Sequence, residues 1–462
     1  MAPPQAYKTA EMPLVPSRPH STILGDLEDQ SSLLIVPWRL IAVGQRLRVE
    51  AHRLQQLSIS IGQTVSNLQE AETNAMFTLV HAMSPSSIKS VIQGTVAYDT
   101  AQGTTTWHDA PSVGGVRTPG VYVVALQSQP DGRFLSKDEI LRVVDGIEDY
   151  ITGCEVLRDK PAAANRNSGE KVKVRWVEAV DAAYSANKRK FSAARPKFNR
   201  DLDNLSGLRA TAAMLRRRCV DGVSDTVRQK QSPIYTGCSQ NLSVRMGDYS
   251  LDRHLVNVNK ALGITLSVAK LKRLPLTPIV RVAIRTWRNE DLALAEQLVL
   301  SLADGFIIHG GFNKKEGGRN PPDNTPQEVT RAERLAIVKS PTFHTNVRAS
   351  IDEIDSRGRF SVLLSRTAKH IEALHGRLTA LDAAVQQAKP DLEKAGAPVD
   401  IEQLLADLTA LRDHKVDKLR CLKNQERTAE ALLAALGVGG APASQQDEVM
   451  EKSSSEQDEG IC

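Results

Sequence analysis

Apolar residues recur at intervals of seven along the N-terminal part of the chain. These positions are Leu40, Leu47, Leu54, Ile61 and Leu68, with Val43 and Leu57 at the complementary offset. A seven-residue repeat is typical of a long helix whose apolar seam packs against another helix. We therefore expect residues 31–112 to be helical and coiled-coil-like.

A second seam lies toward the C-terminus and follows steps of three and four residues. Its apolar positions include Leu364, Ile371, Leu374, Leu378, Leu381 and Val385. The stretch from Pro390 to Pro398 interrupts this pattern, which resumes at Ile401. Two helical stretches joined by a proline-containing connection predict a helical hairpin or coiled coil over 346–437. The two seams together offer surfaces for a homo- or hetero-oligomer.

The pattern changes between the seams. An apolar run after a Gly/Pro turn in GVRTPGVYVVALQS and alternating apolar and arginine positions in TPIVRVAIRTW predict two strands. A third β-prone run, in PIYTGCSQNLSVR, leads into a helix for which Ser239 is a plausible N-cap. Helical spacing predicts further helices over 172–198, 205–230 and 289–303. The expected class is α+β, with a small mixed or antiparallel three-stranded sheet, packed helices and flanking helical segments.

Polar composition marks the ends of the chain and one internal boundary. Residues 1–30 carry five prolines among polar residues, and 438–462 is acidic. Such segments have too little apolar surface to offset the entropy of ordering, so we expect a disordered N-terminal tail and a disordered acidic tail. The glycines, asparagines and prolines in HGGFNKKEGGRNPPDNTP predict a loop that leads into a linker over 321–345.

Composition narrows the possible compartments and partners. The five cysteines lack the short paired spacings of zinc sites, and their odd number fits a disulfide framework poorly. Reduced thiols predict an intracellular protein, and the net charge of +5 favours a nuclear location. No apolar run approaches the roughly 18 residues that span a bilayer, so we expect no membrane partner.

Positive charge is concentrated in one segment. Between Arg158 and Arg200 there are twelve lysines and arginines against four acidic residues, which predicts a basic helical insertion at about 135–230. The candidates for contacts with nucleic-acid phosphates are Lys188, Arg189, Lys190, Arg195 and Lys197. Aromatic residues recur there at Trp176, Tyr184, Phe191 and Phe198. The same spacing is expected if the aromatic residues form the packing face of a helix and the basic residues lie on its solvated opposite face.

Glu296 is an acidic residue on a helix face that should face the core. Its neighbours three and four residues away are Leu292, Ala293, Val299 and Leu300, all apolar. A buried carboxylate is costly unless it meets a cation, a metal or a strong hydrogen-bond donor. The simpler alternative is a structural ion pair with a nearby arginine.

A set of motifs in one order resembles the GIY-YIG endonuclease family. Its members here are Tyr235-Thr236-Gly237, then Ser239, Asn241, Leu242 and Arg245, then a strand, a helix with Glu296, and Asn313 in GGFN. Two triplets compete for the first strand of the family: Gly120-Val121-Tyr122 and Gly222-Val223-Ser224. We favour Gly120-Val121-Tyr122, in a domain spanning 113–320, because residues of a helix cannot pair in a β-ladder.

The resemblance implies a metal-dependent endonuclease that hydrolyses DNA phosphodiesters. It assigns Glu296 to a single Mg²⁺ or Mn²⁺ ion and Arg245 to the scissile phosphate. Tyr122 would take or relay the proton of the attacking water, and Tyr235 would position that water. A tyrosine has a pKa near 10, so this role needs the metal and Arg245 to lower it.

The resemblance also adds two residues to the nucleic-acid candidates. Tyr249 falls where many members of the family place a His or Tyr, and Asn313 matches the closing asparagine. The alternative function is a catalytically inactive GIY-YIG-like DNA-binding or scaffold protein that acts through its coiled coils. Gly222-Val223-Ser224 lies at the distance from Tyr235 that is usual in the family, but it has Ser224 in place of the tyrosine. Thr236 likewise stands in place of isoleucine, and the two departures keep this alternative open.

Overall fold

The computed structural model divides into two units, residues Met1–Ser350 (the main unit) and Ile351–Cys462. The residues it describes are 18–29, 33–37, 39–40, 43–44, 46–47, 73–109, 118–184, 195–219, 222, 224–253, 255, 257–286, 290–315, 327–394 and 410. The helices before the sheet are α1 (Arg18–Asp29), α4 (Thr73–His81), α5 (Pro85–Gln93) and α6 (Val96–Gln102). Those that follow the first strand are α7 (Lys137–Asp159), α8 (Ser168–Ala182), α9 (Ser206–Arg217), α10 (Leu242–Gly247), α11 (Lys260–Leu271), α12 (Glu290–Leu302), α13 (Gln327–Val338) and α14 (Pro341–Lys394).

Three strands form an antiparallel sheet in the order β2-β1-β3. They are β1 (Gly120–Gln127), β2 (Tyr235–Ser239) and β3 (Thr277–Arg285). The continuous apolar run of β1 is buried from Gly120 to Leu126, as expected of a central strand covered on both faces. The sheet confirms the predicted α+β class and the antiparallel option within it.

β1 and β2 are paired although more than a hundred residues separate them. Tyr122 lies opposite Gly237, and Val124 lies opposite Tyr235. The structure thus pairs the Gly120 triplet with the Tyr235 strand. Gly222 lies in a turn with φ of 80°, beyond the end of α9 at Arg217. The predicted helix over 205–230 was therefore too long, and Gly222 is outside the sheet because of a turn and not because of a helix.

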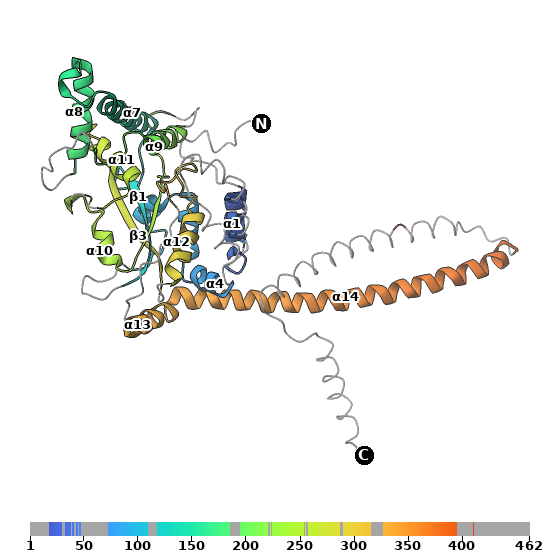
Figure 1. Cartoon of the computed structure of the whole chain (residues 1–462). Coiled ribbons are helices and arrows are strands. Elements are labelled where there is room, and N and C mark those ends of the chain that lie inside the picture. Colours follow the sequence, from blue (N-terminus) through green and yellow to red (C-terminus); the bar gives the residue numbers. More distant parts are fainter. Residues whose placement is uncertain are drawn as a thin grey trace. The chain divides into compact units, whose positions relative to one another are not determined.

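Helices lie around this sheet within the main unit (Figure 1). α12 packs against β1 and β2, and it also contacts α4 and α5. α10 packs against β1 and β2 as well, while α7, α8, α9 and α11 pack against one another. Gly120 makes the contact with α10 possible, because a Cβ there would lie 2.8 Å from Leu242 Cδ1. One continuous hydrophobic core joins these elements.

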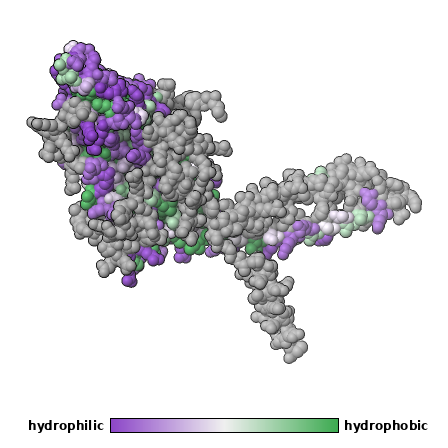
Figure 2. Space-filling view, in the orientation of Figure 1, coloured by the Kyte–Doolittle hydropathy of each residue, from purple (hydrophilic) through white to green (hydrophobic). Residues whose placement is uncertain are grey.

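The basic insertion is helical but differs from its predicted outline. α7 and α8 begin with capping boxes, in which Ser136 pairs with Glu139 and Asn167 with Glu170. α8 ends at Ala182, well short of the predicted 198. Figure 2 shows a mainly hydrophilic surface over α7 and α8.

The aromatic residues described in this insertion belong to the core. Phe198 is buried, and Trp176 and Tyr184 are partly buried against the same cluster. This outcome agrees with the packing-face alternative for Trp176, Tyr184 and Phe198. Phe191 lies outside the described residues.

The N-terminal segment is ordered where the structure describes it. Residues 18–29 form α1, which buries Ile23, and the Nε2 of His20 lies 2.7 Å from the carbonyl oxygen of Ser301. The predicted disorder over 1–30 was wrong for this part, since tertiary contacts hold a sequence that is polar on its own.

The first predicted seam divides into core positions and undescribed ones. Leu40, Val43 and Leu47 are buried in the core of the main unit. The remaining positions Leu54, Leu57, Ile61 and Leu68 lie outside the described residues. The later part of 31–112 consists of short helices, since α5 starts at a Ser84 cap and stops at Gly94 with φ of 71°.

The predicted linker over 321–345 contains α13 and the start of α14. Contacts with the end of α4 hold the first turns of α14: Asn346 Nδ2 donates to the carbonyl oxygens of His81 (2.9 Å) and Met83 (2.7 Å). His81 Nε2 also lies 2.8 Å from Ser350 Oγ. The linker prediction was wrong because these long-range contacts have no local sequence signal.

α14 carries the second seam and continues past Pro390 to Lys394, so the predicted break at Pro390 was placed too early. Nothing is described of the side chains at the seam positions, and the second half of the hairpin and the acidic tail lie outside the described residues apart from residue 410. The coiled coils and the oligomer stay predictions. Among the described helices, none combines the length and the hydropathy of a membrane span.

Candidate functional site

Three tyrosines meet at the β1–β2 edge of the sheet. Tyr122 comes from β1, Tyr235 from β2, and Tyr249 follows α10. Their ring centroids lie 5.6 Å (Tyr122–Tyr249), 6.2 Å (Tyr235–Tyr249) and 6.3 Å (Tyr122–Tyr235) apart. Tyr122 and Tyr249 are buried, whereas Tyr235 is partly exposed.

Gly237 allows this close approach. A Cβ at this position would lie 2.6 Å from Tyr122 Oη and 3.0 Å from Tyr235 Cε1, closer than real Cβ contacts come. The glycine of the second triplet therefore has a steric role, because it leaves room for two tyrosine rings above neighbouring strands.

Arg245 lies against this tyrosine cluster and uses all three of its nitrogens. Nε donates to Tyr122 Oη at 2.9 Å, Nη2 to Tyr249 Oη at 3.4 Å, and Nη1 to Asp248 Oδ2 at 2.8 Å. The two phenol oxygens are 3.1 Å apart. The N-cap of α10 is Asn241 and not the predicted Ser239, which is the last residue of β2. We call Tyr122, Tyr235, Tyr249, Arg245 and Asp248 the tyrosine–arginine cluster.

Glu296 faces inward from α12, as its apolar neighbours predicted, and is only 7% exposed. The thiol of Cys238 on β2 donates to Glu296 Oε2 at 3.1 Å. Burial raises the pKa of Cys238, and the charge of Glu296 raises it further, so this thiol is a protonated donor. The predicted structural alternative for Glu296 was an ion pair with an arginine, and the bond from Cys238 was not predicted.

Burial dominates the protonation of the phenols. It raises the pKa of Tyr122, and neighbouring Tyr235 adds to this, while Arg245 opposes it with a smaller effect. Burial also raises the pKa of Tyr235 and Tyr249. Arg245 alone does not bring the pKa of these tyrosines below its ordinary value, since loss of hydration outweighs one cation. The predicted lowering by Arg245 together with a metal stays a prediction. All three phenols are neutral at physiological pH.

Arg245 keeps its positive charge in this cluster. Burial disfavours the charged form, but the two phenols and Asp248 outweigh that effect and raise the pKa of the guanidinium. The arrangement therefore holds one permanent cation among neutral donors, with a carboxylate on one side.

Asn313 braces the outer edge of β2. Its side-chain oxygen accepts from the backbone nitrogen of Thr236 at 2.9 Å, and its Nδ2 donates to the Thr236 carbonyl at 2.7 Å. Both ends of the amide are used in this way, which gives Asn313 a structural role at the edge of β2. The Asn313 side chain thus makes the two backbone hydrogen bonds that a neighbouring strand would make with Thr236. Its predicted contact with nucleic acid stays a prediction.

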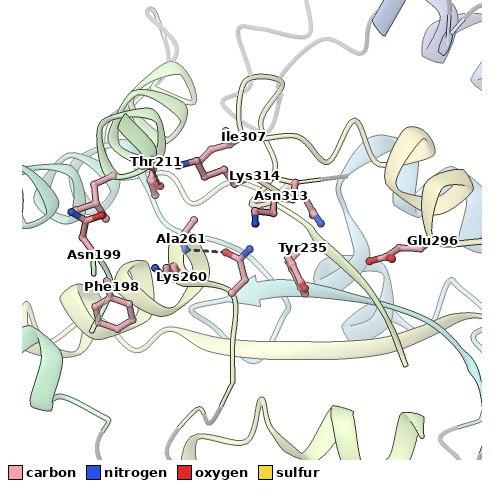
Figure 3. Close-up of a pocket in the computed structure, with 14 residues that line it drawn as sticks. Phe198, Asn199, Thr211, Tyr235, Lys260, Ala261, Glu296, Ile307, Asn313 and Lys314 are labelled. Atoms are coloured by element: carbon pink, nitrogen blue, oxygen red, sulfur yellow. Dashed lines mark hydrogen bonds between the residues drawn. The ribbon is translucent and has the colours of Figure 1, made fainter. Parts of the chain in front are cut away.

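A pocket of about 520 Å³ adjoins the cluster. Tyr235 and Glu296 line one end, Phe198, Asn199 and Lys260 line the other, and Asn313 and Lys314 lie between them (Figure 3). Tyr122 and Arg245 are not among the lining residues, although Tyr122 packs beside Tyr235. The structure thus gathers Tyr122, Tyr235, Arg245 and Glu296 around one region.

Of the predicted phosphate-binding residues of the insertion, the two that the structure describes, Arg195 and Lys197, do not line this pocket. Arg195 and Lys197 are exposed, and the Lys197 amine lies 5.2 Å from the centre of the Phe198 ring. Lys188, Arg189 and Lys190 lie outside the described residues. The lysines that do line the pocket, Lys260, Lys314 and Lys315, were missed by sequence reasoning.

The fold and the site together define an α+β protein with a small antiparallel sheet, a buried tyrosine–arginine cluster and an adjoining pocket. Comparison with protein-family models, with curated proteins and with solved structures finds no match to the chain.

Proposed function

We propose that the protein is a metal-dependent endonuclease of the GIY-YIG type that hydrolyses DNA phosphodiesters. The observation that carries this proposal is the meeting of Tyr122, Tyr235 and Arg245 beside the pocket that Glu296 lines. Support also comes from the order of the elements. The two triplets lie on paired strands, the arginine lies on the helix after the second strand, and the glutamate lies on the helix after the third.

The charged and polar side chains divide the work of hydrolysis. Arg245 supplies the permanent positive charge that a phosphate needs, and a phosphate oxygen would compete with Asp248 for Nη1. The neutral phenols act as hydrogen-bond donors that orient the phosphate or a water. Among the residues that line the pocket, Glu296 has the one carboxylate, so it is the charged acceptor available there.

The donor set at Glu296 fits Mg²⁺ or Mn²⁺. In the described ranges, no group of three or more His, Cys, Asp and Glu side chains is placed to hold a metal. Mg²⁺, however, commonly uses one or two carboxylates together with waters and substrate phosphates. Glu296 would hold the ion, and the bound ion would neutralise charge on phosphoryl oxygens and acidify a water. The Cys238 thiol orients one carboxylate oxygen.

Cleavage of supercoiled plasmid and of a labelled DNA duplex, with and without Mg²⁺, tests this proposal. Glu296→Gln keeps the shape and loses the charge, so we expect Mg²⁺-dependent cleavage to fall by at least about a hundredfold. Glu178→Gln, at an exposed position of α8, is the matched control and should cleave as the unchanged protein does. Equal cleavage by the two variants would assign the activity to another site.

A second candidate is a DNA-binding protein without catalysis, which acts through its predicted coiled coils. One observation favours this candidate. The side-chain nitrogens of Arg245 already donate hydrogen bonds to Asp248 and to two phenols, so the cluster needs no ligand to complete it. Binding of the duplex without cleavage at any Mg²⁺ or Mn²⁺ concentration would support this candidate over the nuclease.

A further inference from the structure

The pocket beside Tyr235 has a positively charged wall that the hydrolysis above does not use. Lys260 is the first residue of α11, and Lys314 and Lys315 follow Asn313 on the loop after α12. All three line the pocket, which we call the lysine pocket. Sequence positions more than fifty residues apart are thus brought to one cavity.

The lysines of this wall act on one another. Burial lowers the pKa of Lys260, and the charges of Arg200, Lys314 and Lys315 lower it further. Lys314 has its pKa lowered by burial and by Lys315, with Asp201 offsetting part of the effect. Like charges held close together cost free energy unless an anion joins them. The wall therefore has the electrostatics of a site that is completed by a ligand.

The Lys314 amine packs against the part of the pocket wall that α9 forms. A Cβ on Gly207 of α9 would lie 2.9 Å from Lys314 Nζ, so the amine lies directly over this glycine. Gly207 also lines the pocket, together with Leu208 and Thr211 of the same helix. The N-terminus of α11, capped by Asn259, adds its partial positive charge on the side of Lys260.

We propose that the lysine pocket holds the sugar–phosphate backbone of a single nucleic-acid strand next to the reacting phosphate. This inference rests on the proposed function. Lysines on flexible stems neutralise phosphates without reading bases, which suits an enzyme that must hold any sequence. A volume of about 520 Å³ accommodates a nucleotide-sized group and not a duplex. Tyr235 and Glu296 at the far end set the position of the reacting phosphate (Figure 3).

The test is fluorescence anisotropy of a labelled single-stranded DNA, longer than the ~16 nucleotides that one small binding domain covers, in EDTA. The variant is Lys260→Ala, Lys314→Ala and Lys315→Ala in one chain. The matched control removes the same charge from exposed positions outside the basic insertion, by Arg331→Ala, Arg334→Ala and Lys339→Ala. A third variant with arginine at the three pocket positions keeps the charge.

We expect the pocket variant to bind on the order of tenfold more weakly at low salt. Its slope of log affinity against log salt should shrink by about 2, since each lost phosphate contact on a single strand contributes about 0.7. The control and the arginine variant should stay within about twofold of the unchanged protein. Circular dichroism verifies that each variant is folded.

Three outcomes would overturn the inference, and they differ in what else they overturn. If the pocket variant binds like the control while the unchanged protein cleaves DNA, only the lysine pocket is wrong. If a nucleoside monophosphate competes as well as the strand at equal phosphate concentration, the site takes a free nucleotide and not a strand. If the unchanged protein binds no DNA at low salt, the proposed function fails together with the inference.

Discussion

The tyrosine–arginine cluster and the lysine pocket lie side by side but differ in how their positive charges are compensated. In the tyrosine–arginine cluster, Arg245 is enclosed by two phenols and Asp248, and each of its nitrogens has a protein partner. In the lysine pocket, Arg200, Lys314 and Lys315 repel the charge of Lys260, and Lys315 repels that of Lys314 while Asp201 offsets part of the effect. The cluster is organised without a ligand, whereas the proposed nucleic-acid strand would offset the repulsion in the pocket. We therefore expect mutations in the cluster to lower the free energy of unfolding and mutations in the lysine pocket to leave it nearly unchanged.

Removal of the cluster's cation should have the largest effect on stability. Arg245→Met leaves Asp248 and two buried phenols without their donor, so we expect the free energy of unfolding to fall by about 2–3 kcal/mol. Urea denaturation followed by circular dichroism measures this. A loss below about 0.5 kcal/mol would mean that the cluster is not the self-contained unit described above.

Crowding of the same cluster from the strand should have the next largest effect. Gly237→Ala places a methyl group 2.6 Å from Tyr122 Oη, and we expect a loss of about 1–3 kcal/mol. Gly358→Ala is the matched control, because a Cβ there meets nothing within 4 Å in the helix α14. That change should stabilise its helix by roughly 0.5–1 kcal/mol. Equal responses at the two glycines would contradict the steric role of Gly237.

Acid should destabilise the fold through histidines that belong to neither region. Burial is the main cause that lowers the pKa of His20, His81 and His108 from 6.5. A lowered pKa means that the folded state binds protons less readily than the unfolded state, so stability is complete above about pH 6.5 and falls below it. Melting temperatures between pH 8 and pH 5 measure this loss. A flat profile across that window would show that these histidines are hydrated.

A separate loss is expected at much lower pH. Burial alone would raise the pKa of Asp304, but His309, His20 and Arg46 outweigh it and lower the pKa from 3.8 to about 2. This contribution is present above pH 3.8 and disappears as the pH falls through about 2. The melting profile should therefore show two acid steps, and Asp304→Asn should remove the lower one.

Removal of one pocket lysine should have the smallest effect on stability. Lys314→Met keeps most of the side-chain volume and relieves repulsion from Lys315, so we expect a change within about 0.5 kcal/mol, if anything stabilising. Urea denaturation of this variant beside Arg245→Met compares the two regions directly. A clear destabilisation by Lys314→Met would show that the lysine has a structural partner.

The parts of the fold that sequence predicted are those with strong local patterns. The apolar run of β1, the alternation in β3 and the helix α12 all appeared in place. α1 was missed because contacts far along the chain hold it, such as His20 with Ser301. Gly222 was excluded from the sheet for the wrong reason, since it occupies a turn.

The candidate site shows the same division. The local spacing from Tyr235 to Arg245 and the apolar neighbours of Glu296 placed those side chains correctly. Cys238 and the three pocket lysines had no local signal, because their neighbours come from distant elements. Asn313 was found from its place in GGFN, but its structural role was not, since sequence does not show that both ends of its amide bond to Thr236.

The pairing of β1 with β2 has a consequence for how the chain is made. During synthesis, the apolar strand GVYVVALQ leaves the ribosome more than a hundred residues before either of its partners. Such distant pairing slows folding and leaves an unpaired strand exposed to other chains. We expect the nascent chain to depend on chaperones until residue 285 has emerged, and the isolated protein to refold slowly and lose material to aggregation at high concentration.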